Sequence, residues 1–167
     1  GNTGTDANGY TMTITGNVNF TGSQDVSWSI AKKDIGDAKI VLGAGLTYND
    51  EEQTQTVASV TVDGLDVPTY TVTGNTGKNA NNDYTLTVKA DGNFIGTQTA
   101  KWSIDPLDIS KAATFGVMFD DPTYNGQEQT PDVVSAEVLI GTKLVKITFQ
   151  VDVTPQVNAG EYKLAII

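Results

Sequence analysis

The chain repeats one of its own segments. Residues 10–30 read YTMTITGNVNFTGSQDVSWSI, and residues 84–104 read YTLTVKADGNFIGTQTAKWSI. Six residue pairs recur at a single offset of 74 positions (84 − 10 = 74). The pairs are Tyr10 and Tyr84, Phe20 and Phe94, Gly22 and Gly96, Gln24 and Gln98, Trp28 and Trp102, and Ile30 and Ile104. A catalytic site is usually written once, so a repeated segment indicates repeated architecture.

Two further blocks extend the repeat. LTYNDEEQTQ at 46–55 matches PTYNGQEQTP at 122–131 with an offset of 76 (124 − 48), and NAGEYKLAI at 158–166 is similar to NNDYTLTV at 81–88. The repeating unit is therefore about 75 residues long, a period typical of tandem arrays of small domains. The chain is expected to hold the C-terminal strands of a preceding repeat (1–30), one complete repeat (31–104) and a repeat that lacks its last strands (105–167).

Period-two alternation within the repeat predicts strands. Tyr84, Leu86 and Val88 point to one face of a strand, and the threonines and lysine between them point to the other. Asp-Gly pairs at 63–64 and 91–92 predict tight turns. Further strands are predicted at 56–62, 69–73, 133–140 and 145–153. Short strands separated by regular turn signals predict an all-β fold, with immunoglobulin-like β-sandwich domains in tandem.

Composition excludes several kinds of chemistry. The chain has no Cys and no His, so neither Ser-His-Asp nor Cys-His nucleophile systems can form, nor can His-based zinc or iron sites. The ten basic residues are all Lys and form no cluster, which argues against nucleic-acid binding. We read the net charge of −10 as an aid to solubility. No apolar stretch is long enough to predict a membrane-spanning helix.

Aromatic residues offer two interpretations. Trp28 and Trp102 are either core residues or a platform for stacking sugars. Their alternation with Val or Ala and Ile favours the core. Tyr48 and Tyr124 lie in the TYN blocks and are either corner tyrosines bonded to a backbone carbonyl or exposed binding residues.

Acidic residues were considered as metal ligands or as an acid/base pair. The clusters at 49–52 and 120–121 carry the oxygen ligands that Ca²⁺ takes, but residues 125–128 read NGQE, so the charge is not repeated and a solvated loop is favoured. Asp34 and Asp108 match between repeats and are expected to serve a turn or the domain junction. We assign no catalytic, cofactor-binding or metal-binding residues.

The tripeptide Asn19-Phe20-Thr21 has the glycosylation pattern. Its counterpart, Asn93-Phe94-Ile95, does not, and Phe20 is expected to be buried. We therefore interpret the match as accidental.

With TYNGQEQTP, NAGEYKLAI and YTLTVKADGNFIGTQTAKWSI in view, the chain resembles the glycine- and threonine-rich immunoglobulin-like tandem repeats of large bacterial surface proteins (MBG/YDG-type). The resemblance covers nearly the whole chain. It implies export, an extracellular or cell-surface location, a stalk or adhesin role, and no catalytic residues. The sequence departs from the pattern at Asp50, where the family has Gly, and at Asn82-Asp83, which replaces an Ala-Gly turn. These changes affect local loop shape.

The expected function is therefore a non-enzymatic segment of a secreted or cell-surface bacterial protein. The alternative is a carbohydrate- or protein-binding module that uses loops or an exposed sheet face, and a carboxylate glycosidase is disfavoured by size and by the repeats. The partner would be an unidentified protein or glycan. The partial repeats 1–30 and 105–167 are complementary in pattern, which predicts that they combine, within a chain or by strand exchange between chains. The alternative is that 1–30 extends the sheet of the central repeat.

Overall fold

The computed structural model describes residues 1–112, 114–163 and 165–166, which form two compact units. The first unit comprises Gly1–Thr47 and Glu52–Asp105, and the second comprises Tyr48–Glu51 and Pro106–Ile167. Leu164, which belongs to the repeat block at 158–166, lies outside the described residues, as do Ala113 and Ile167.

Strands make up 51% of the chain, about twice their usual share of a globular protein, which confirms the all-β prediction. The described residues form no helix long and apolar enough to cross a membrane.

The first unit begins with a hairpin of β1 (Gly9–Thr15) and β2 (Ser23–Ser29), which pair with each other and with no other strand among the described residues. Two hydrogen bonds join the hairpin to the rest of the unit. The backbone N–H of Ala7 donates to Asn93 Oδ1 (2.9 Å), and Asn93 Nδ2 donates to Asp6 Oδ1 (2.9 Å).

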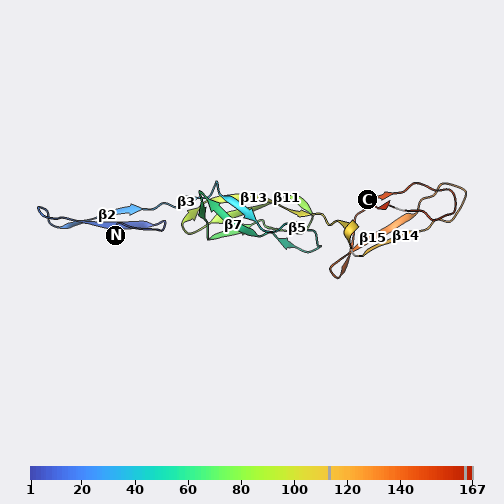
Figure 1. Ribbon diagram of the computed structural model, residues 1–167, viewed down its shortest axis with the longest axis horizontal. Coiled ribbons are helices and arrows are strands. Elements are labelled where there is room, and N and C mark those ends of the chain that lie inside the picture. The colour runs from blue at the N-terminus through green and yellow to red at the C-terminus, as the bar shows by residue number, and fades with distance from the viewer. Residues whose placement is uncertain (113, 164, 167) are drawn as a thin grey trace. The chain divides into compact units, whose positions relative to one another are not determined.

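The remainder of the first unit contains two larger sheets. The four-stranded sheet has the order β5-β13-β11-β9, and the three-stranded sheet has the order β4-β7-β8. Two short pairs, β10 with β6 and β12 with β3, flank them. The strand bounds are β3 (Lys33–Asp34), β4 (Lys39–Leu42), β5 (Leu46–Thr47), β6 (Gln53–Thr54), β7 (Val57–Val62), β8 (Leu65–Asp66), β9 (Tyr70–Thr73), β10 (Thr76–Gly77), β11 (Asn81–Ala90), β12 (Phe94–Ile95) and β13 (Thr97–Asp105). The long strands β11 and β13 lie side by side (Figure 1).

Both sheets contribute to one apolar core. The three-stranded sheet supplies Val60 and Val62, and the four-stranded sheet supplies Leu86, Val88 and Ile104, all at most 4% exposed. Burial of aliphatic side chains from two sheets is the main stabilising term expected for a fold of this size. The arrangement is compatible with a β-sandwich.

The hairpin β1–β2 reproduces the pairing of β11 with β13. Tyr10 pairs with Trp28 as Tyr84 pairs with Trp102. The turns match as well, since the N–H of Gly16 donates to Gly22 O (2.9 Å) as that of Ala90 donates to Gly96 O (3.1 Å). Gly22 and Gly96 both have positive φ, at 86° and 93°. The sequence offset of 74 is thus also the offset of the hydrogen-bonded register.

The two hairpins differ in what covers them. Val88 and Phe94 are 0% and 9% exposed, whereas their counterparts Ile14 and Phe20 are 56% and 75% exposed. The other strands of the first unit bury the β11–β13 face, and none of them covers the face of β1–β2. The prediction that Phe20 is buried was therefore wrong.

The second unit contains a three-stranded sheet of order β14-β15-β16 and a pair, β17-β18. The bounds are β14 (Phe115–Asp120), β15 (Asp132–Ile140), β16 (Lys143–Lys146), β17 (Val151–Asp152) and β18 (Ala165–Ile166), and Ile109–Lys111 form a 3₁₀ turn. Strands β14 and β15 lie side by side (Figure 1). Ala136 and Val138 on β15 are each 1% exposed and form the buried centre of this sheet.

Most predicted strands are present, at 57–62, 70–73 and 132–140. The Asp63-Gly64 turn is confirmed, with φ of 49° and 79° at its two residues, the signature of a tight hairpin turn. The single strand predicted at 145–153 is wrong. Its residues divide between β16, which pairs with β15, and β17, which pairs with β18.

Candidate functional site

The second unit has a cavity of about 550 Å³. Its wall is formed by two stretches, 119–131 and 153–163. Its apolar and aromatic lining residues include Phe119, Pro122, Tyr124, Pro131, Val157 and Tyr162. Asp121, Glu161 and Lys163 add charge to the wall. Mostly apolar cavities of this size with a few polar groups are typical of ligand-binding sites.

Tyr162 is held in place by its hydroxyl group, which donates to the carbonyl oxygen of Asn158 (2.8 Å). The same kind of bond recurs in the first unit. The Tyr84 hydroxyl donates to Asn79 O (3.0 Å), and the Tyr10 hydroxyl donates to Asp6 O (2.7 Å). Each bond spans four or five residues and closes the loop that leads into a strand. Sequence reasoning assigned this role to Tyr48 and Tyr124, although all three segments contain a Tyr at the matched position.

Tyr84 and Tyr10 each stack on a tryptophan. The ring centroids of Tyr84 and Trp102 lie 4.4 Å apart, and those of Tyr10 and Trp28 lie 4.7 Å apart. Each indole N–H also donates to a glycine carbonyl, Trp102 to Gly74 (3.1 Å) and Trp28 to Gly1 (3.2 Å). The ring of Tyr162 faces the cavity instead and is 53% exposed as a residue.

Trp102 is 4% exposed, which confirms its predicted place in the core. Trp28 is only half-buried, and its neighbour on the same face, Val26, is 37% exposed. The same prediction therefore does not hold for Trp28. The alternation identified the correct face of β2 but gave no information on whether other strands cover that face.

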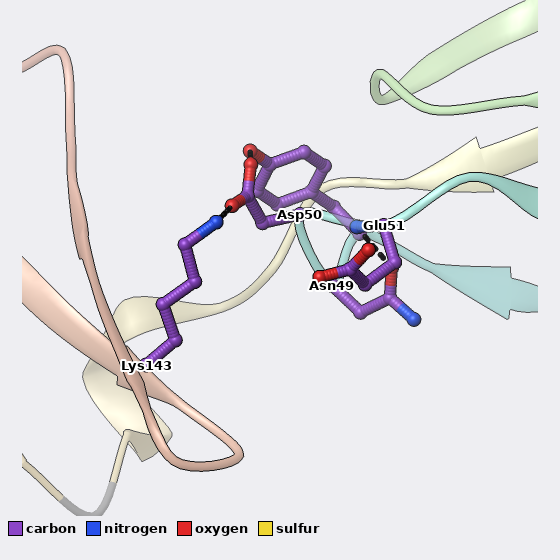
Figure 2. A network of polar contacts seen from close by, with 5 residues as sticks. Asn49, Asp50, Glu51 and Lys143 are labelled. Carbon is purple, nitrogen blue, oxygen red and sulfur yellow. Dashed lines mark hydrogen bonds and ion pairs between the residues drawn. The ribbon is translucent and has the colours of Figure 1, made fainter.

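The acidic turn at 49–52 is organised by hydrogen bonds (Figure 2). The Asn49 side chain accepts from the N–H of Glu51 (2.9 Å), and the Tyr48 hydroxyl donates to Asp50 Oδ1 (3.1 Å). Asp50 also pairs with the ammonium group of Lys143, and this ion pair raises the pKa of Lys143. Within the described residues, no group of three or more acidic side chains is arranged to hold a metal ion.

Asp34 and Asp108 both organise local turns. Asp34 Oδ1 accepts from the N–H of Gly36 (2.6 Å), and Asp108 Oδ1 accepts from the N–H (3.0 Å) and the hydroxyl (2.6 Å) of Ser110. Lys111 lies 2.8 Å from the other oxygen of Asp108. Lys111 and Ser110 together lower the pKa of Asp108 to about 2. Both carboxylates thus have the turn role that the sequence predicted for them.

Tyr124 is 63% exposed and lines the cavity, so it fits the binding interpretation better than the corner one. Sequence reasoning did not identify the cavity as a site. No protein family, curated protein or solved structure matches this chain.

Proposed function

We propose that the chain is a non-enzymatic segment of a secreted or cell-surface bacterial protein, in which immunoglobulin-like repeats act as a stalk or adhesin spacer. The observation that carries the proposal is the equivalence of the two hairpins, in which sequence, register, turn and Tyr-Trp stack all recur. Repetition at this level is the mark of tandem modules that add length.

Two features support the immunoglobulin-like assignment. The loop-closing bonds of Tyr10, Tyr84 and Tyr162 resemble the tyrosine corner of such folds, in which the hydroxyl group bonds to the backbone a few residues upstream. In addition, a tryptophan in the core of the first unit packs between two sheets' worth of aliphatic residues. The acidic surface charge and the short tight turns suit an exported, soluble segment.

A stalk module must resist pulling and unfold as a unit, so force spectroscopy on the full chain tests the proposal. The part of the first unit from Lys33 to Asp105 holds 73 residues (105 − 33 + 1). We expect one discrete unfolding event from this part, with a gain in chain length of about 240–260 Å before the folded span is subtracted. Gradual extension with no such event would contradict a mechanical role.

The cavity of the second unit favours a second candidate, a carbohydrate-binding module. Two tyrosines and a phenylalanine on one wall are the kind of surface on which sugar rings stack. Screening the full chain against a glycan panel tests it. Saturable binding that Tyr124→Ala abolishes, with the thermal midpoint unchanged, would favour this candidate over the spacer.

A further inference from the structure

The cavity of the second unit corresponds to a place that is filled in the first. Pro122 is the counterpart of Leu46 (122 − 46 = 76), and Leu46 on β5 pairs with Ile104 at the end of β13. Tyr162 is the counterpart of Tyr84, whose ring stacks on Trp102 of the same strand. Both landmarks of the cavity are therefore residues whose counterparts contact the Trp102–Asp105 end of β13.

The rest of the second unit pairs as the first unit does. Strands β14, β15 and β16 occupy the positions of β4, β7 and β8, and β17 pairs with β18 as β9 pairs with β11. Gln129 and Gln156 form a bridge where β6 pairs with β10. Among the described residues of this unit, no strand occupies the position of β13. The cavity is the space that such a strand fills in the first unit.

The hairpin β1–β2 carries the matching surface. Its strand β2 has the register and the Trp-Ser-Ile sequence of β13, and its edge away from β1 has no strand partner among the described residues. Ile14 and Phe20 are exposed, although their counterparts Val88 and Phe94 lie in the core. Unpaired strand edges with an apolar face are templates for pairing with another chain.

We propose that the hairpin β1–β2 of one chain docks into the cavity of the second unit of another copy, with Trp28 beside Tyr162 in the role that Trp102 has beside Tyr84. This interaction goes beyond the spacer function and does not depend on it. Each chain has one hairpin and one such cavity, so the contact is heterologous. It produces a head-to-tail chain of copies, or a ring where the geometry closes.

Sedimentation of the full chain over a range from micromolar to near-millimolar concentration tests the proposal. The expected result is reversible association that grows with concentration. Two variants separate the two surfaces: Phe20→Ser alters the hairpin face, and Phe119→Ser alters the cavity wall. Each should weaken association by about tenfold or more, as the loss of a buried aromatic anchor does. Leu65→Ser, at an apolar residue on β8 that is 54% exposed, is the matched control and should leave association unchanged.

Mixing the two variants is the decisive arm. The Phe119→Ser chain retains a normal hairpin and the Phe20→Ser chain retains a normal cavity, so the mixture should form heterodimers although neither variant associates alone. This arm works even where Phe119→Ser unfolds the second unit, because that chain contributes only its hairpin. Monomers at every concentration would overturn the proposal, as would association that survives Phe119→Ser or a mixture that stays monomeric.

Discussion

Asp50 has a backbone conformation that non-glycine residues seldom adopt, with φ of 64°. Its counterpart, Gly126, has φ of 77°. The same side-chain bond shapes both turns, because Asn125 accepts from the N–H of Gln127 (2.9 Å) as Asn49 accepts from that of Glu51. The turn is thus set by the asparagine, and Asp50 tolerates the left-handed region better than most residues with a Cβ.

Replacing Asp50 separates backbone strain from its polar contacts. Asp50→Gly and Asp50→Ala both remove the bonds to Lys143 and Tyr48, but only alanine keeps a Cβ at positive φ. The glycine variant should therefore be more stable than the alanine variant by about 1 kcal/mol. Urea unfolding of the two proteins measures the difference, and equal midpoints would mean that the turn relaxes without cost.

Asp108 gives a prediction about pH. Its pKa in the folded protein, about 2, lies below the ordinary value of 3.8, so folding favours the ionised carboxylate. The contribution to stability is therefore complete above about pH 4 and is lost as the pH falls through about 2. NMR titration of the Asp108 carboxyl carbon should show the low pKa. Lys111→Gln should raise it, because the ion pair and hydrogen bond of Lys111 are its largest cause.

At the scale of elements, one hairpin sequence occurs in two environments. Strands β11 and β13 form part of a closed core, whereas β1 and β2 carry the same face half-open. The number of neighbours, and not the local sequence, determines what each side chain contributes to stability.

Truncating the two tryptophans should therefore have unequal effects. Trp102→Ala removes a side chain from the core and should cost about 3–5 kcal/mol in the free energy of unfolding of its unit. Trp28→Ala should leave the unfolding transition of that core nearly unchanged, since Trp28 contacts Tyr10 and Gly1 within its own hairpin. Thermal unfolding of both variants at a concentration where the chain is monomeric checks this, and equal losses would contradict it.

Sequence patterns predicted these elements better than their surroundings. Alternation at 84–104 gave the correct face of Trp102, and the Asp63-Gly64 pair gave the correct turn. The same alternation at 145–153 could not show that the chain leaves one sheet after Lys146 and joins another at Val151, because period two says nothing about the partner strand. Strand β14 was missed entirely. The cavity could not be predicted, since two stretches distant in sequence form its wall.

At the scale of the whole molecule, the net charge of −10 raises the question of calcium. The acidic residues are dispersed: Asp120 and Asp121 are not repeated elsewhere, and Asp50 already pairs with Lys143. We expect neither a chelator nor added Ca²⁺ to move the thermal midpoint, when NaCl of equal ionic strength is the control for screening. A shift of several degrees specific to Ca²⁺ would show selective binding to the folded state.

The chain has only two tryptophans, and both stack on a tyrosine at nearly the same distance, but only one of them is shielded from water. The protein therefore carries two natural fluorophores with different emission. Trp102 should emit at shorter wavelength and resist quenching by acrylamide, and Trp28 should emit at longer wavelength and be quenched readily. A single spectrum then reports separately on the core and on the hairpin, without any label attached to the protein.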